Sequence, residues 1–383
     1  ILKLQQMGTP SASGIAMHSQ IQSTNQNFDP NFDQMNLKEN AFIIKAPNSK
    51  FKNDDPQHEY FIGAFGTNAL RDFIPNFAYM MGIFRCSPPY PDARGIQTFC
   101  QNNDPNNLVN YLIYENVTNS ISLYEFIRTH PFEDFLNVFT QLIFALAFAY
   151  QQYDFTHYDL HSSNILIKLS DAPMTIPYSL FDANGSSKTY YLVTKYVATI
   201  IDYGKSHIKY QGEDFGFNGI FAGIFPNRSY PMYDVFKLLC FSLLDMFEGK
   251  QDTAYNNRQE MVGKYDDEIM GRYGTLRSDS YIKARKMLRF FYNGFNLSDS
   301  GDVTDGISYI MGLADTRFPL PFMTDFNVSP VKFYEMVLLD LYPDLISTFV
   351  FSSPPPGIVV YGCGQTGTCK SLSQALQDYT RSV

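Results

Sequence analysis

Short apolar segments separated by turn residues fill the chain up to about residue 115. Their length and alternation predict β-strands at residues 1–7, 15–21, 41–46, 77–84 and 109–114. A helical pattern interrupts the strands at residues 57–72, and the Asn, Asp and Pro residues at 25–40 predict an exposed loop. The first part of the chain is therefore expected to form a small, strand-rich lobe.

After residue 115 the apolar positions recur at spacings of three and four. This repeat predicts a long helix with one apolar face, formed by Phe135, Val138, Phe139, Leu142, Leu146 and Ala149. Residues 234–246 and 330–341 predict further buried helices, and residues 165–167 and 198–201 predict apolar strands. The pattern predicts an α+β protein with a small lobe at 1–115 and a larger, helical lobe at 116–383.

The charge, the apolar runs and the cysteines of the chain argue against several classes of protein. The formal charge of −9 argues against a general nucleic-acid binder and against an anionic membrane surface, because both need a basic patch. The longest apolar run, residues 142–150, is about half as long as a membrane span. The five cysteines are odd in number and scattered, which is typical of free thiols in a reducing compartment rather than of a disulfide framework.

The segment His157-Tyr158-Asp159-Leu160-His161-Ser162-Ser163-Asn164 stands between the long helix and an apolar strand. A second apolar strand, residues 198–201, runs directly into Asp202-Tyr203-Gly204. Such residues also collect in ordinary turns, where their side chains bond to the nearby backbone. Two polar groups in this order, each at the end of a strand, favour a functional site over two unrelated turns.

These two segments resemble the catalytic loop of protein kinases and their metal-binding Asp-Phe-Gly motif. The resemblance implies a bilobal protein-kinase-like fold, with an antiparallel β-sheet in the small lobe. It also implies that ATP and Mg²⁺ are the cofactors. Asp159 is then the catalytic carboxylate that accepts the proton of the acceptor hydroxyl, and Asn164 and Asp202 are the metal ligands.

The same resemblance extends into the small lobe and covers residues 1 to about 250. Ala41-Phe42-Ile43-Ile44-Lys45 resembles the strand whose lysine pairs with the ATP phosphates, and Glu59 is the expected ion-pair partner of Lys45. Gly8 and Gly14 bound the expected phosphate-covering loop, and backbone groups near Glu115 are expected to meet the adenine. In the helical lobe, Asp234 resembles the buried aspartate that braces the catalytic loop.

The chain departs from the usual kinase pattern at several positions. Tyr158 stands where many kinases have Arg, which predicts that no activating phosphorylation is needed. His161 stands where protein kinases usually have Lys, and we expect it to be one of the catalytic residues. No Ala-Pro-Glu motif follows Asp202. The long insert between Asn164 and Asp202 predicts an extra hairpin at residues 178–191 with a turn at Asn184-Gly185.

Three short segments narrow the resemblance to the divergent serine/threonine kinases of large DNA viruses: residues 59–63, 74–77 and 200–206. It implies a protein substrate with Ser/Thr acceptors, association with other virion or host proteins, and a location in the host cytoplasm or in a virion. No nucleic-acid or membrane partner is expected. Two alternatives stay open: a small-molecule phosphotransferase of the aminoglycoside or choline kinase type, and a pseudokinase with a scaffold or virion structural role.

Residues 364–371 differ by one residue from a Walker A phosphate loop. Cys369 occupies the place of the glycine that lets the backbone close on phosphate, and too little chain follows for the rest of a nucleotide-binding domain. This segment is therefore expected to precede a terminal helix at residues 372–379 rather than to bind nucleotide.

Overall fold

The computed structural model describes residues 3–7, 15–20, 41–47, 54–88, 90–91, 97–98, 100, 107–181, 185–216, 228–247, 275–291 and 329–362. The chain divides into two compact units. Unit 1 comprises residues 1–69, 78–118 and 202–204, and unit 2 comprises residues 70–77, 119–201 and 205–383. Most of unit 1 precedes residue 118 and most of unit 2 follows it. The exceptions are residues 70–77, which belong to unit 2, and residues 202–204, which belong to unit 1.

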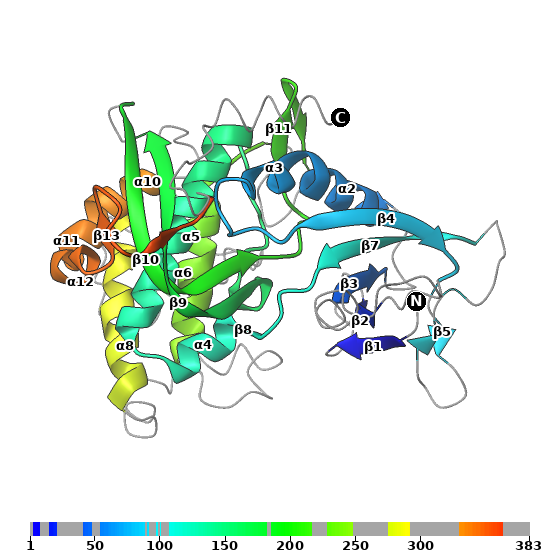
Figure 1. The fold of residues 1–383 in the computed structure, drawn as a ribbon, viewed down its shortest axis with the longest axis horizontal. Helices are drawn as coiled ribbons and strands as arrows, with labels where there is room; N and C mark the ends of the chain where they lie inside the picture. Colours follow the sequence, from blue (N-terminus) through cyan, green and yellow to red (C-terminus); the bar gives the residue numbers. More distant parts are fainter. Residues whose placement is uncertain are drawn as a thin grey trace. The chain divides into compact units, whose positions relative to one another are not determined.

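Unit 1 contains a five-stranded antiparallel sheet (Figure 1). Its strands, in spatial order, are β1 (Lys3–Met7), β2 (Ile15–Gln20), β3 (Ala41–Ala46), β7 (Val109–Glu115) and β4 (Met80–Cys86). Ile15, Met17, Ile44 and Tyr111 form part of its buried core. The predicted strands are confirmed, except that the one expected at 77–84 begins at residue 80.

One helical segment packs against β4 and β7. It consists of α2 (Asp54–Ile62), a π-helical turn η1 (Gly63–Thr67) and α3 (Asn68–Leu70), which together match the helix predicted at 57–72. A Cβ atom on Gly63 would lie 2.7 Å from the Cβ of Met80, so only glycine allows the helix to approach β4 this closely. This approach fixes the helix, and with it Glu59, on the sheet.

Unit 2 is built around a long hairpin of β9 (Ile165–Phe181) and β10 (Ser187–Ile200). The predicted extra hairpin is confirmed, and it is longer than residues 178–191. Gly185, with φ of 80°, follows its turn, whereas Asn184 lies outside the described residues. Three short strands extend the sheet: β8 (Ser120–Ser122) and β14 (Val359–Val360) pair with β9, and β13 (Val350–Phe351) pairs with β10.

Helices pack against this hairpin and against one another (Figure 1). The principal ones are α4 (Leu123–Thr129), α5 (Phe132–Tyr153), α6 (Pro231–Phe247), α8 (Thr275–Arg285) and η4 (Lys286–Phe290). The helix predicted at 330–341 comprises α10 (Pro330–Phe333), a π turn η6 (Tyr334–Leu338) and α11 (Leu339–Leu341), and α12 (Pro343–Ser347) follows. The remaining short elements are η2 (Ser162–Asn164), β5 (Tyr90–Pro91), β6 (Gln97–Thr98), β11 (Ile208–Tyr210) and β12 (Glu213–Phe215). The α+β class is confirmed.

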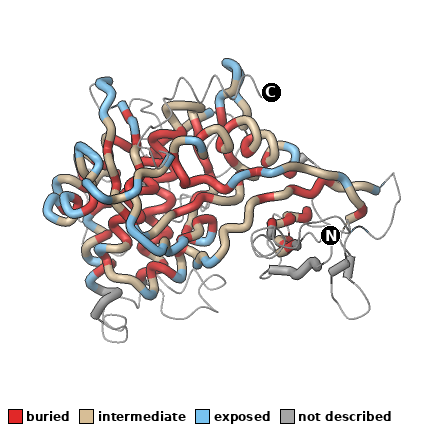
Figure 2. Tube along the Cα trace, in the orientation of Figure 1, coloured by how far each residue is buried: buried red, intermediate tan, exposed pale blue. Residues whose placement is uncertain are grey.

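Helix α5 is apolar on nearly all sides. It is long and apolar enough to cross a membrane by composition alone, but most of it is buried inside unit 2, as Figure 2 shows. Phe139 on α5 lies against Phe333 of α10, and Phe144 lies against Tyr178 of β9. These contacts are those of the central core helix of a folded domain.

Asn76 joins the hairpin to α5. Its Nδ2 donates to Gln141 Oε1 and to the Ala198 carbonyl, both at 2.8 Å, and its Oδ1 accepts from the Tyr178 hydroxyl at 2.7 Å. The Ile200 amide donates to the Asn76 carbonyl at 2.8 Å. One buried side chain thus ties both strands of the hairpin to the helix.

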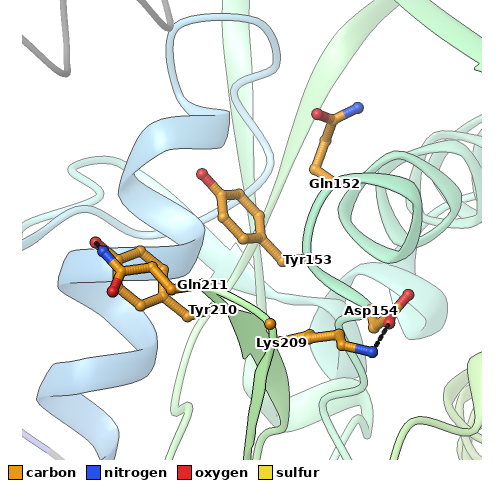
Figure 3. Close-up of a pocket in the computed structure, with 7 residues that line it drawn as sticks. Gln152, Tyr153, Asp154, Lys209, Tyr210 and Gln211 are labelled. Atoms are coloured by element: carbon orange, nitrogen blue, oxygen red, sulfur yellow. Dashed lines mark hydrogen bonds and ion pairs between the residues drawn. The ribbon is translucent and has the colours of Figure 1, made fainter.

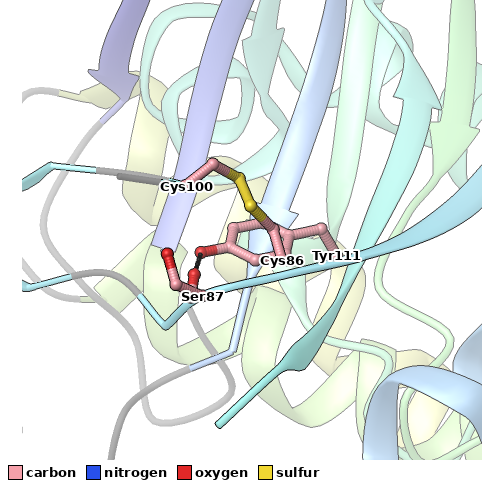
Figure 4. The surroundings of a disulfide bond; sticks show 4 residues. All are labelled: Cys86, Ser87, Cys100 and Tyr111. Carbon is pink, nitrogen blue, oxygen red and sulfur yellow. Dashed lines mark hydrogen bonds between the residues drawn. A yellow bond between two sulfur atoms is a disulfide. The ribbon is translucent and has the colours of Figure 1, made fainter. Parts of the chain in front are cut away.

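Two of the five cysteines form a disulfide, which corrects the expectation of free thiols. Cys86 at the end of β4 is bonded to Cys100, and their Cα atoms are 5.3 Å apart (Figure 4). Next to it the Tyr111 hydroxyl donates to the Ser87 carbonyl at 2.6 Å. The sequence separation of 14 residues did not reveal this pair, because the strand and the chain that follows it bring the two cysteines together. Cys240 is a free, buried thiol.

Candidate active site

Lys45, Glu59 and Asp202 form one ionic cluster in unit 1. Lys45 Nζ lies 2.8 Å from Glu59 Oε2 and 2.7 Å from Asp202 Oδ1. Burial disfavours the charged lysine, but the two carboxylates outweigh it and raise the pKa of Lys45 well above its usual range. Burial raises the pKa of Glu59, while Lys45 opposes the shift. The structure thus brings together three residues selected from the sequence.

The backbone at Asp202 is bent to present its carboxylate. Asp202 has a left-handed φ of 67°, a conformation that aspartate tolerates better than most residues. The next residue, Tyr203, is buried and its hydroxyl donates to the Ala78 carbonyl at 2.9 Å. At Gly204 a Cβ atom would lie 3.4 Å from Glu59 Oε2 and 3.5 Å from Asp202 Oδ1, so this residue is directly beside the ionic cluster.

In unit 2 the segment 157–164 is braced from α6. Asp234 accepts the amide hydrogens of His157 and Tyr158 at 2.5 and 2.9 Å. Burial raises the pKa of Asp234 to about 7, while the two amide hydrogen bonds favour its ionised form. The contact predicted for this buried aspartate is present.

Backbone and side-chain bonds then fix the shape of the loop. His157 Nδ1 accepts from the Asp159 amide at 3.2 Å, so its Nε2, 2.9 Å from the Ile201 carbonyl, carries the hydrogen. Asn164 Nδ2 donates to the Asp159 carbonyl at 2.9 Å, and the Asn164 carbonyl accepts from the Ile201 amide at 3.0 Å. The loop is therefore tied to the residue that immediately precedes Asp202.

Two lysines bind the Asp159 carboxylate, one at each oxygen. Lys237 Nζ lies 2.6 Å from Oδ1 and Lys205 Nζ lies 2.8 Å from Oδ2. Burial would raise the pKa of Asp159, but the two cations outweigh burial and hold it well below its usual range. Neither contact was predicted from the sequence, since Lys237 resembles a surface residue of an amphipathic helix. Its place three residues after Asp234, on the same side of α6, was the available signal.

The two positions at which the loop departs from the kinase pattern have structural roles. Tyr158 is fully buried, and its hydroxyl donates to the Arg228 carbonyl. His161 Nδ1 accepts from the Ser163 amide at 3.3 Å and thereby caps η2.

The remaining predicted site residues are Glu115, Gly8 and Gly14. Glu115 ends β7, where its Oε1 accepts from the Tyr79 amide at 2.9 Å and its own amide donates to the Tyr79 carbonyl at 3.0 Å. Gly8, Gly14 and the Walker-like residues 364–371 lie outside the described part of the chain.

A pocket on unit 2 contains none of the predicted site residues (Figure 3). It is lined by Gln152, Tyr153, Asp154, Lys209, Tyr210, Gln211 and Gly212. Lys209 lies 4.0 Å from Asp154 there, and both side chains are nearly half exposed. The pocket is therefore a surface feature at the end of α5, apart from the chemistry assigned to segment 157–164.

Two of the predicted metal ligands, Asp202 in unit 1 and Asn164 in unit 2, carry the oxygen donors that Mg²⁺ prefers. Asp202 offers a carboxylate and Asn164 an amide oxygen, and Mg²⁺ typically takes one or two protein ligands and completes its shell with phosphate oxygens and water. Within the described residues no group of three or more His, Cys, Asp or Glu side chains could hold a metal by itself.

Residues 81–250 match the family model of the Haspin like kinase domain. The match includes segment 157–164, Asp202, Lys205 and Lys237, whose contacts are described above. This part of the chain is similar to the Haspin-like kinase domain, which belongs to the protein kinase superfamily. The match confirms the resemblance to protein kinases drawn from segments 157–164 and 202–204.

Three viral proteins are similar to part of this chain. An uncharacterized protein, 179R, of Invertebrate iridescent virus 6 is 30% identical over 244 residues, which are 61% of this chain and 20% of that protein. A probable kinase, 098L, of Invertebrate iridescent virus 3 is 25% identical over 239 residues, 60% of this chain and 39% of that protein. A second uncharacterized protein of that virus, 035R, is 27% identical over 188 residues, 47% of this chain and 17% of that protein. The aligned part is thus between about a sixth and two fifths of the length of these relatives.

Proposed function

We propose that the chain is an ATP- and Mg²⁺-dependent protein kinase that phosphorylates Ser/Thr hydroxyls. The observation that carries this proposal is the double ion pair of Lys45 with Glu59 and Asp202. A lysine held in this way is directed toward phosphate oxygens, and the adjacent carboxylate is available to a metal. A scaffold protein needs neither, whereas phosphoryl transfer depends on both.

Each residue would have a separate task. Lys45 would bind the ATP phosphates, and Asp202 and Asn164 would hold Mg²⁺, which neutralises charge on the phosphates during transfer. Asp159 would orient the acceptor hydroxyl and take its proton. The acceptor would be a protein of the virus or of its host, as the similarity to iridescent virus proteins suggests.

The test is incubation of the full chain with labelled ATP and Mg²⁺, with casein, a basic protein or no acceptor offered in parallel. We expect label on a protein acceptor, and loss of transfer when Mg²⁺ is chelated or when Asp202 is changed to Asn. Asp171→Asn, at an exposed position on β9, is the matched control and should be unaffected. Unchanged transfer by Asp202→Asn would reject the metal assignment.

Phosphoamino-acid analysis of the labelled product tests the acceptor class. Label on serine or threonine supports the proposal, whereas label on tyrosine contradicts it. Labelling of an aminoglycoside or choline instead of any protein would favour a small-molecule phosphotransferase. Absence of ATP binding in the folded protein would favour a pseudokinase.

A further inference from the structure

The two lysines on Asp159 differ in how firmly they are held. The Lys237 side chain is 4% exposed and the Lys205 side chain 38% exposed. Lys237 also donates to the Tyr158 carbonyl at 3.0 Å and lies 5.9 Å from the ring centre of Phe241. Moving Lys237 away would leave a buried ammonium without its carboxylate, which is costly, whereas the more exposed ion pair of Lys205 with Asp159 is weakened by water and costs less to exchange for another anion.

Segment 157–164 supplies no positive charge of its own. It contains no Lys or Arg, and its two histidines use ring nitrogens to accept backbone hydrogens. The phosphoryl group carries negative charge spread over its oxygens during transfer, and a nearby cation stabilises that charge. Lys205 is the exposed cation that the structure places on Asp159.

We propose that Lys205 is the binding residue for the transferred phosphoryl group, and that Lys237 is the positioning residue that holds Asp159 when Lys205 leaves it. This inference rests on the proposed kinase function and deepens it. A phosphate carries more negative charge than a carboxylate already shared with Lys237, so bound ATP draws Lys205 away from Oδ2. That oxygen then accepts the hydrogen of the acceptor hydroxyl.

The transfer step balances with these groups alone. The acceptor oxygen forms a bond to the γ-phosphorus, and the bond from phosphorus to the β,γ-bridging oxygen breaks, leaving its electron pair on ADP. The hydroxyl proton passes to Asp159, and Lys205 stays with the phosphoryl oxygens throughout. Lys237 keeps Asp159 Oδ1 fixed and exchanges no proton.

Equilibrium binding of ATP and of ADP, both with Mg²⁺, separates the role of Lys205 from general damage to the site. Lys205→Met should weaken ATP binding about 10- to 100-fold, the range for a hydrogen bond between charged groups, and leave ADP binding unchanged. Lys205→Arg should restore most of the ATP affinity. Lys209→Met, an exposed lysine four residues farther along, is the control and should bind both nucleotides as the unaltered chain does.

The outcomes are distinguishable. If Lys205→Met changes the two affinities equally, or changes neither, the phosphoryl-binding role is wrong although the kinase proposal stands. If the unaltered, folded chain binds neither nucleotide and labels no acceptor, the proposed function fails, and this inference with it.

Lys237 is tested by separating binding from turnover. Lys237→Met should bind ATP and ADP with unchanged affinity but label casein at least about tenfold more slowly, and Lys237→Arg should recover part of the rate. Thermal unfolding of each variant gives the folded fraction, to which the rates are normalised. Loss of fold lowers the number of nucleotide-binding sites but not the rate per site. An unchanged rate per site in Lys237→Met would therefore overturn the positioning role.

Discussion

Asp159 lies between two ammonium groups, and this limits what its carboxylate can do. Without nucleotide the two cations outweigh burial and keep its pKa well below the usual range, and Lys237 remains on Oδ1 when Lys205 moves to the phosphate, so the carboxylate stays ionised and is a weak base. A weak base takes the proton late, when the bond from the acceptor oxygen to phosphorus is already forming. Orientation of the hydroxyl is then its main contribution.

Asp159→Asn is therefore expected to lower the transfer rate by about 10²- to 10⁴-fold, the usual range for a positioned acid or base. Nucleotide affinity should remain, because Asp159 does not contact the nucleotide in the proposed mechanism. The variant should also unfold at a lower temperature, since Lys237 loses its anion in a buried site. Rates normalised to the folded fraction check this, and a fall in ATP affinity at an unchanged rate per bound ATP would contradict the role.

Among individual residues, the sequence indicated the carboxylate and amide side chains more readily than the lysines that contact Asp159. Asp159, Asn164 and Asp202 stand at recognisable spacings beside strands, and Lys45 was found from the strand that carries it. Lys237 was missed because a lysine in an apolar helix usually reaches solvent with its ammonium group. Only the fold shows that its ammonium points at the loop, where Asp234 on the same helix already binds the backbone.

Among the elements, the long hairpin depends on the buried side chain of Asn76. Asn76→Ala would remove two donors and one acceptor from partners in β9, β10 and α5. Each buried polar group left without a partner costs about 1–3 kcal/mol, so we expect the free energy of unfolding to fall by about 3 kcal/mol or more. Urea unfolding measures this. Asn107→Ala, the same change at an exposed position, should stay within about 0.5 kcal/mol of the unaltered chain.

The prediction that no activating phosphorylation is needed concerns the segment that follows Asp202. Tyr158 packs between Tyr230 and Tyr233 and donates to the Arg228 carbonyl, so this position offers a buried phenol and no guanidinium to a phosphate. Lys205, a nearby cation, is paired with Asp159 and passes to the phosphate of bound ATP in the proposed mechanism, so it is not assigned to a phosphorylated residue. No phosphorylation in residues 205–232 should be required for activity.

A broad phosphatase, removed before the assay, is expected to leave the initial rate unchanged, and mass spectrometry verifies the loss of phosphate. A sample treated with inhibited phosphatase serves as the control. A large loss of rate that returns on rephosphorylation within residues 205–232 would refute the prediction.

The elements themselves followed from hydrophobic spacing, but their lengths did not. The hairpin was expected at residues 178–191 and begins at Ile165, because β9 and β10 stay paired, across one irregularity near Thr194, from Phe181 and Ser187 to Ile165 and Ile200. Periodicity cannot show this continuity, which depends on pairing between residues far apart in the sequence. The Cys86–Cys100 disulfide was missed for the same reason.

At the scale of the whole molecule, each of the two units is made of several separate stretches of the chain. The sequence predicts a single boundary after residue 115, whereas residues 70–77 lie in unit 2 and residues 202–204 in unit 1. A hydrophobic pattern read along the chain assigns neighbours to one lobe, so it cannot detect such exchanged segments. Asn76 and Phe77 show the consequence, since Asn76 bonds to the hairpin and Phe77 stacks edge-on against Phe155 at 5.5 Å.

A fragment of residues 119–383 is therefore expected to fold poorly. It lacks Asn76 and Phe77, so the Ala198 carbonyl, the Tyr178 hydroxyl and the ring of Phe155 lose their partners together. The matched fragment restores residues 70–77 through a flexible Gly/Ser linker in place of residues 78–118. We expect cooperative thermal unfolding, followed by circular dichroism, only in the second fragment, and a linked fragment that carries Asn76→Ala should melt at a lower temperature. If residues 119–383 alone unfolded as cooperatively and at the same temperature as the linked fragment, then residues 70–77 would not be part of unit 2.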